Sequence, residues 1–189
     1  MRFCSHTLTS DIGLAPNPFG DYCTLALGTP NHMGIRAEPG DWFVGISAKK
    51  RGSRLVYAME VCQVLHFDEY FHDSRFAMKK PVPRGSWQQR CGDNIYYRDD
   101  RDRWQRLPSP FHQKPEEQEK DLRNPYAFIA EHFYYFGEDA VDLPRSLRGL
   151  ITGLGVKCSH SPELVDRFLR WLQHSFEQGR HGLPHDRPR

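Results

Sequence analysis

The chain has 189 residues, a formal net charge of +2 and a hydrophobic fraction of 38%. This length suits one domain spanning 1–189, and the small net charge excludes the bulk positive field of a strong nonspecific duplex binder. The sequence lacks a signal-peptide core and any apolar run long enough for a membrane helix, so we expect a protein outside the membrane. Because its five cysteines are odd in number and scattered, we expect no disulfide framework and a cytoplasmic location.

The first half of the chain predicts β-strands separated by tight turns. Residues 23–27, 42–46 and 55–65 are rich in apolar, β-branched and aromatic side chains, as strands are. The basic turn 49–53 lies between the second and third of these runs, so we expect a hairpin there. Residues 67–71 then predict a short helical turn.

The second half alternates between polar and ordered segments. Residues 98–124 contain several prolines and many charges, so we expect an exposed insert or long loop, unless a short element is hidden there. Residues 127–136 predict an aromatic-rich strand and residues 146–152 a short helix.

The clearest element is a C-terminal amphipathic helix. Ser161 suits its N-cap, Pro162 its first turn and Gly179 its end. Its apolar side chains recur at helical spacing and are Leu164, Val165, Phe168, Leu169, Leu172 and Phe176. We expect this stripe to pack on the core, with binding of a partner protein as the alternative.

Several motifs carry a family resemblance. They are GLAPNPFGDYCTLAL (13–27), PGDWFVG (39–45), RLVYAMEVCQVLHFDEYF (54–71), GDNIYY (92–97) and HFYYFGEDAVDLP (132–144). Together they resemble the nucleotide modification associated domain group, closest to its second type. That resemblance implies a component of a DNA base-modification system that recognises, and in one alternative processes, a modified nucleobase in phages or bacteria.

A second resemblance concerns the fold. The segment from the Gly-Asp turn at 40–41 to residue 61 is similar to PUA-like barrels, which include ASCH, EVE and YTH domains and hold RNA or a flipped base beside the barrel. It implies an α+β protein: a PUA-like β-barrel with short helices and the C-terminal helix. One departure is Gly28-Thr29-Pro30, where relatives are expected to carry a Lys or Cys beside the proline.

Three polar turns, at 17–21, 41–42 and 93–96, are the candidate base-binding site. Amide and carboxylate groups can read the edge of a base, and aromatic rings can stack on it. If the two Gly-Asp turns, at 40–41 and 92–93, open onto one face, their polar side chains converge on a shared cleft, and we expect residues 17–21 and 93–97 to line one recess. The residues assigned this role are Asn17, Phe19, Trp42, Asp93, Asn94 and Tyr96. The alternative is structural, with turn chemistry for the polar residues and core packing for Trp42.

A basic strip is the candidate phosphate-binding surface. Residues 79–106 carry more basic than acidic side chains, and the residues assigned to phosphate are Lys79, Lys80, Arg84 and Arg90. The alternative is a solvated loop with internal salt bridges. DNA or a modified nucleotide is therefore the expected partner, with a base-modifying enzyme as a second one.

An enzymatic function is the alternative to recognition. A hydrolase or group-transfer enzyme acting on a hypermodified base, or on its nucleotide precursor, would use Asp11, Asp21 or Cys23 for acid–base or nucleophilic chemistry. The Cys and His spacings lack the paired pattern of a structural zinc site, so we expect no metal, and no cofactor is indicated.

Overall fold

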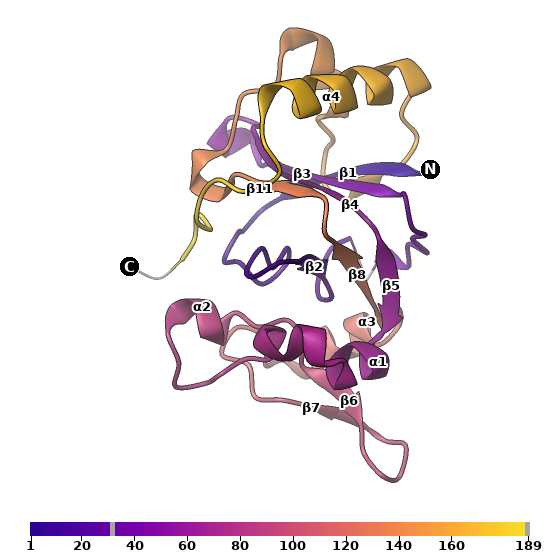
Figure 1. The fold of residues 1–189 in the computed structure, drawn as a ribbon, viewed down its shortest axis with the longest axis vertical. Coiled ribbons are helices and arrows are strands. Elements are labelled where there is room, and N and C mark those ends of the chain that lie inside the picture. Colours follow the sequence, from indigo (N-terminus) through magenta and orange to yellow (C-terminus); the bar gives the residue numbers. More distant parts are fainter. Residues whose placement is uncertain (31–32, 188–189) are drawn as a thin grey trace.

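The computed structural model describes residues 1–30 and 33–187. Its main sheet has the strand order β10-β1-β3-β4-β9-β11 (Figure 1). The bounds of these strands are β1 Phe3–Leu8, β3 Trp42–Ser47, β4 Leu55–Glu60, β9 Phe133–Tyr135, β10 Val156–Lys157 and β11 Gly179–Arg180. The pairs β1/β3 and β9/β11 are parallel, and the other pairs are antiparallel. The predicted hairpin of 41–65 is confirmed in β3 and β4.

A second sheet continues from the first. It has the order β2-β8-β5, with β2 at Cys23–Leu25, β8 at Tyr126–Ala130 and β5 at Gln63–His66. Val61 and Cys62 separate β4 from β5, and Glu131 and His132 separate β8 from β9. The predicted strands 55–65 and 127–136 are therefore each two strands, because the chain passes from one sheet into the other at these points.

The remaining elements are short, apart from one helix. The hairpin β6 Tyr96–Arg98 and β7 Trp104–Arg106 forms a third sheet. The α-helices are α1 Phe67–His72, α2 Trp87–Arg90, α3 Pro115–Asp121 and α4 Pro162–Ser175. Short 3-10 helices span Lys49–Arg51, Ser74–Lys79, Gly137–Asp139 and Arg145–Leu150.

Helix α4 covers one face of the main sheet (Figure 1). The hydroxyl of Ser161 accepts a hydrogen bond from the backbone N–H of Leu164, which confirms the predicted N-cap. Val165, Phe168 and Leu172 are buried against the sheet, so the apolar stripe packs on the core as expected. The helix ends at Ser175 rather than at the predicted Gly179, which instead begins β11.

Successive side chains of β3 point to opposite faces of the main sheet and pack into two different hydrophobic cores. Trp42 and Val44 of β3 face the core under α4, whereas Phe43 faces the core shared with the second sheet, where its ring stacks on Phe128 at a centroid distance of 5.2 Å. The described strands form three sheets without closing into a barrel. The mixed α and β content agrees with the expected class, but the PUA-like barrel is not confirmed.

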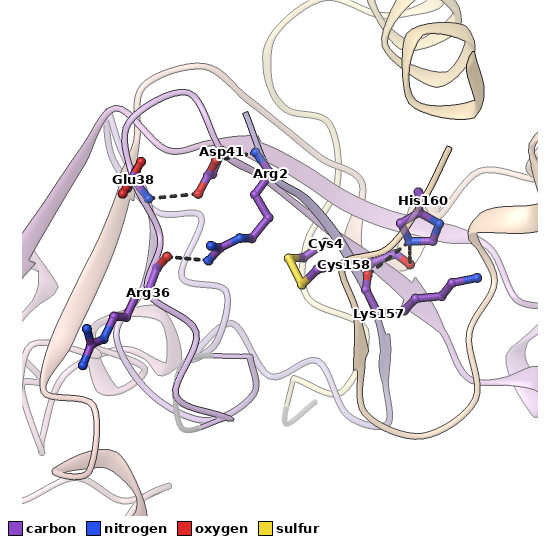
Figure 2. The surroundings of a disulfide bond; sticks show 9 residues. Arg2, Cys4, Arg36, Glu38, Asp41, Lys157, Cys158 and His160 are labelled. Carbon is purple, nitrogen blue, oxygen red and sulfur yellow. Dashed lines mark hydrogen bonds between the residues drawn. A yellow bond between two sulfur atoms is a disulfide. The ribbon is translucent and has the colours of Figure 1, made fainter. Parts of the chain in front are cut away.

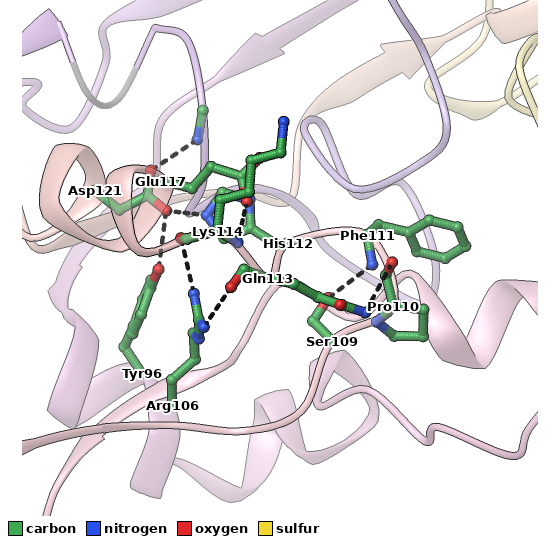
Figure 3. A network of polar contacts seen from close by, with 11 residues as sticks. Tyr96, Arg106, Ser109, Pro110, Phe111, His112, Gln113, Lys114, Glu117 and Asp121 are labelled. Atoms are coloured by element: carbon green, nitrogen blue, oxygen red, sulfur yellow. Dashed lines mark hydrogen bonds and ion pairs between the residues drawn. The ribbon is translucent and has the colours of Figure 1, made fainter.

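The segment 98–124 is more ordered than predicted. It contains β7 and α3, and the last residue of α3, Asp121, is fully buried. Its carboxylate lies 2.5 Å from His112 Nε2 and accepts hydrogen bonds from the hydroxyl of Tyr96 and the backbone N–H of Gly28 (Figure 3). The segment is therefore anchored to the body of the protein by a polar cluster.

A disulfide bond joins Cys4 to Cys158 (Figure 2). The expectation of no disulfide was therefore wrong for this pair. In the antiparallel pairing of β1 with β10, Ser5 lies opposite Lys157, so the same register places Cys4 opposite Cys158. The two cysteines are 154 residues apart in the sequence, so their proximity could not be recognised from their spacing. Cys23 and Cys91 are buried free thiols, and Cys62 is an exposed one.

Candidate functional site

Two of the predicted base-binding segments, 17–21 and 93–97, lie next to each other in the structure. The side-chain amide of Asn17 donates to the carbonyl of Cys91 at 2.9 Å, and the hydroxyl of Thr24 donates to the carboxylate of Asp93 at 2.7 Å. Their contact zone is filled rather than hollow, because Asn17, Asp93 and Asn94 are each at most 2% exposed. Each is hydrogen-bonded to another part of the protein: Asn17 to the Cys91 carbonyl, Asp93 to the hydroxyls of Thr24 and Tyr70, and Asn94 to the Tyr70 carbonyl.

Lys79 lies at the centre of the same zone. Its ammonium group donates to the carbonyl and side-chain oxygens of Asn17 and to the carbonyl of Tyr22, at 2.7 to 2.9 Å. Burial lowers the pKa of Lys79 to about 8, and burial raises that of Asp93, which accepts from Thr24 and Tyr70. Lys79 could contact a phosphate only if its ammonium group left these partners. Its hydrogen bonds connect the 3-10 helix Ser74–Lys79 to the loop that contains Asn17 and Tyr22.

The aromatic candidates are also buried. Trp42 and Phe19 are 2% and 4% exposed, and Tyr96 is 1% exposed. Their rings contact His132, Trp87 and Phe67 respectively. Stacking on a base would require these rings to be uncovered, and their assigned role stays a prediction.

The other basic candidates lie nearer the surface. Arg84 is exposed, while Lys80 and Arg90 are half-buried. The ammonium of Lys80 lies 3.8 Å from the centroid of the Phe71 ring, and the Arg90 guanidinium lies over Phe111. Phosphate binding by these three residues stays a prediction.

Asp11 is the candidate catalytic residue with the most unusual environment. It is 3% exposed, and both of its carboxylate oxygens lie 2.8 Å from the hydroxyl of Tyr135. Burial raises its pKa, although the hydrogen bond from Tyr135 opposes that effect. A carboxyl group with a raised pKa can act as a proton donor.

Tyr135 ends a row of polar side chains that crosses the main sheet. The strand register aligns His6 with Gly45, Gly45 with Tyr57, and Tyr57 with Tyr135. Gly45 makes room for the row, because a Cβ at this position would overlap the ring of Tyr57. His6 Nε2 and the Tyr57 hydroxyl are 2.6 Å apart, and burial lowers the pKa of His6 to about 4.

A small cavity opens beside Asp11. It has a volume of about 80 Å³, and Arg51, Arg54, Glu138 and His185 also line it. This volume suits a few water molecules or a small chemical group, whereas a whole nucleotide needs a larger site.

The other two catalytic candidates lie in different surroundings. Burial raises the pKa of the Cys23 thiol to about 12, so it lacks the lowered pKa on which the nucleophile hypothesis depends. Asp21 is exposed, and it lines a shallow depression of about 540 Å³ together with Glu131 and Arg180. Among the described residues, no group of His, Cys, Asp and Glu side chains is placed to hold a metal ion.

A larger pocket involves residues that the sequence did not indicate. It has a volume of about 550 Å³, within the range of small-molecule sites. Its lining consists of Gly34, Ile35, Arg36, Ala37, Val64, Arg123, Asn124, Tyr126 and Phe128. It thus combines apolar side chains with an aromatic ring, an amide and two guanidinium groups. We call it the Arg–Tyr pocket.

The two arginines of the Arg–Tyr pocket are held differently. The carbonyl of Arg36 accepts a hydrogen bond from the Arg2 side chain, while the exposed Arg36 guanidinium forms no ion pair with any described residue (Figure 2). Arg123 forms an exposed ion pair with Glu119 at 2.7 Å. Tyr126 is 41% exposed. Exposed cations beside an exposed ring are the groups that bind phosphates and stack on bases.

The sequence offered one weak signal for this pocket. The Arg123-Asn124-Pro125-Tyr126 run places a cation, an amide and an aromatic residue together, at the end of the segment expected to be an insert. Arg36 comes from a distant loop that only the fold brings close.

No described helix is long and apolar enough to cross a membrane.

Comparisons with known proteins identify the family. Searches of curated proteins and of solved structures give no match to the chain. The family model described as nucleotide modification associated domain 2 matches residues 2–188, which confirms the resemblance inferred from the motifs. The chain therefore belongs to the nucleotide modification associated domain 2 family.

Proposed function

We propose that this protein recognises a nucleotide, or a nucleobase within a nucleic acid, as a component of a nucleotide modification system. Family membership gives the general role, and the Arg–Tyr pocket supports the specific one. In this proposal the base lies against Tyr126, and Arg36 and Arg123 bind phosphate.

The observation that carries the proposal is the composition of this pocket. Ile35, Val64 and Phe128 supply apolar surface, and the cations stand at an exposed position beside it. A flat heterocycle with a charged phosphate has the same division between an apolar ring and an anionic end. The side chains of Asn17 and Asp93, by contrast, are almost fully buried and already hydrogen-bonded within the protein.

The test is calorimetric titration of the full chain with deoxynucleoside monophosphates, unmodified and with a hydroxymethylated base. Arg123→Gln should weaken binding by about 10-fold or more, since a charged hydrogen bond contributes about 1.5–3 kcal/mol. Tyr126→Leu should weaken it further, as stacking on a base contributes about 1–3 kcal/mol.

Two further variants make the test specific. Glu119→Gln removes the carboxylate that competes for Arg123, so it should tighten phosphate binding. Arg170→Gln changes an exposed arginine of α4 and should leave the affinity unchanged. Equal weakening by Arg170→Gln and Arg123→Gln, or no nucleotide binding at all, would contradict the proposal.

The environment of Asp11 favours a second candidate function, hydrolysis or group transfer on a modified base or its precursor. Its carboxyl has a raised pKa and adjoins the 80 Å³ cavity. In this hypothesis Asp11 donates or accepts a proton and Tyr135 positions it. Incubation of the protein with modified nucleotides should then change their mass, and Asp11→Asn should abolish that change, whereas Asp21→Asn should not.

A further inference from the structure

A strongly basic surface lies where the β3–β4 turn meets the 3-10 helix Arg145–Leu150. The turn carries Lys49 and Lys50, and the helix carries Arg145 and Arg148, all of them exposed. The backbone bridge between Leu55 and Val141 ties the two segments together. We call these four residues the turn–helix patch.

The turn and the helix adjoin at the surface. Arg148 lines a depression of about 170 Å³ together with Gly52 and Ser53 of the turn. Arg145 and Arg148 are three positions apart, and residues at this spacing in a 3-10 helix lie on the same side. Arg167 of α4 extends the cationic surface, since its guanidinium donates to the carbonyl of Ser146.

The turn–helix patch has one carboxylate close by, that of Asp142, which lines the same depression as Arg148. None of its four residues forms an ion pair with a described residue. Next to it, Arg54 is paired with Asp142 at 3.0 Å and Arg51 with Asp186 at 2.7 Å, so those cations are already neutralised. In the β6–β7 hairpin, Arg98 is paired with Asp102 and Arg103 with Asp99, whereas Arg101 has no ion pair with a described residue. The turn–helix patch therefore presents four exposed cations close along the surface, although the whole chain carries only +2.

We propose that the turn–helix patch binds the phosphate backbone of a single-stranded polynucleotide. Several cations spread along a surface match a row of phosphates better than one nucleotide, which the Arg–Tyr pocket would hold. This inference rests on the proposed function for its partner class, and it names a polymer rather than a free nucleotide as that partner.

The test compares three forms of the full chain by fluorescence anisotropy with a labelled single-stranded DNA of mixed sequence. The patch variant carries Lys49→Gln, Arg145→Gln and Arg148→Gln. The matched variant carries Lys80→Gln, Arg84→Gln and Arg90→Gln, which removes the same charge from the strip that the sequence suggested. Unchanged thermal unfolding midpoints establish that both variants remain folded.

The expected result is salt-dependent binding that only the patch variant loses. Each phosphate contact contributes about 0.7 to the slope of log affinity against log salt for single strands, so three lost contacts should reduce the slope by about 2. Mononucleotide affinity should be the same in all three forms. Loss of polymer binding in the matched variant alone, or equal loss in both, would overturn the inference and assign the contact to the strip or to diffuse charge.

Failure of this inference can be distinguished from failure of the proposed function. If the patch variant binds DNA like the unmodified protein while Arg123→Gln loses mononucleotide binding, the patch proposal falls and the Arg–Tyr pocket stands. If no form binds mononucleotides but the patch variant alone loses DNA, the pocket proposal falls and the patch stands.

Discussion

The hydroxyl of Tyr135 lies 2.8 Å from each carboxylate oxygen of Asp11, although 124 residues separate the two along the chain. The contact joins the loop after β1 to the end of β9. The C-terminal segment covers it, since the backbone N–H of His185 also points to the Asp11 carboxylate and the backbones of Asp11 and Asp186 are hydrogen-bonded. One buried carboxylate therefore links three distant parts of the sequence.

Tyr135→Phe should destabilise the protein by about 1–3 kcal/mol, because a buried carboxylate loses its only side-chain donor among the described residues. The same change should raise the pKa of Asp11 further, because the charged carboxylate loses a donor. The decrease in the free energy of unfolding should therefore be greater at neutral pH, where Asp11 is charged in the unfolded chain, than in acid. Urea unfolding at both pH values measures this. Tyr97→Phe, whose ring stacks on Phe71, is the control and should have little effect.

His6 should make stability depend on pH between about 4 and 6.5. Burial lowers its pKa from 6.5 to about 4 in the folded protein, so over this interval the unfolded chain binds a proton that the folded one does not. Stability should be complete above pH 6.5 and fall by about 3 kcal/mol as the pH approaches 4. The difference in unfolding free energy between the unmodified protein and His6→Gln isolates this contribution. A difference that is constant with pH would refute it, and the exposed His174→Gln serves as the reference.

Gly45→Ala should be strongly destabilising. The added methyl group would overlap the Tyr57 ring and the side chain of Leu8, and relieving such overpacking costs about 1–3 kcal/mol or more. Thermal unfolding should show a clear decrease in Tm. Gly153→Ala has open space around its Cβ and should leave Tm nearly unchanged.

Reduction of the Cys4–Cys158 bond should lower the free energy of unfolding. Closing a loop with a sequence separation of 154 residues restricts the unfolded chain by up to about 5 kcal/mol in the chain-entropy treatment. Urea unfolding with and without reductant measures the loss, and the double change Cys4→Ser with Cys158→Ser should reproduce it. Insensitivity to reductant would show that the bond does not contribute, and Cys62→Ser controls for the exposed thiol.

The sequence predicted the elements that are marked by local features, such as a helix cap, a helical apolar stripe or a turn between two strands. The N-cap at Ser161 and the apolar stripe gave α4, and the basic turn after Ile46 gave the β3–β4 hairpin. Strand β1 was missed, because its FCSHTL run includes Ser5 and His6, which are polar but buried. A strand enclosed on both sides does not show the apolar–polar alternation of a half-exposed one.

The candidate site was predictable only in part. The structure places the turns of Asn17 and Asp93 side by side, yet the sequence could not show that both are buried and that Lys79 is hydrogen-bonded to Asn17 there, so their role in base binding stays a prediction. The Arg–Tyr pocket was hidden because Arg36 and Arg123 lie on loops whose proximity depends on the fold. Asp11 was singled out from the sequence, but its partner Tyr135, which is 124 residues away along the chain, could be found only from the folded structure.

Strand β1 lies inside the main sheet, between β3 and β10, and the loop that follows it is hydrogen-bonded to Asp186. During synthesis the ribosome releases this first strand long before residues 156–157 and 185–186 exist. Until then one edge of β1 remains unpaired, and unpaired strand edges promote association with other chains. Truncations from the C-terminus should therefore yield insoluble protein, and co-expression with a chaperone that shields nascent chains should matter more for this protein than for one whose neighbouring strands follow one another in sequence.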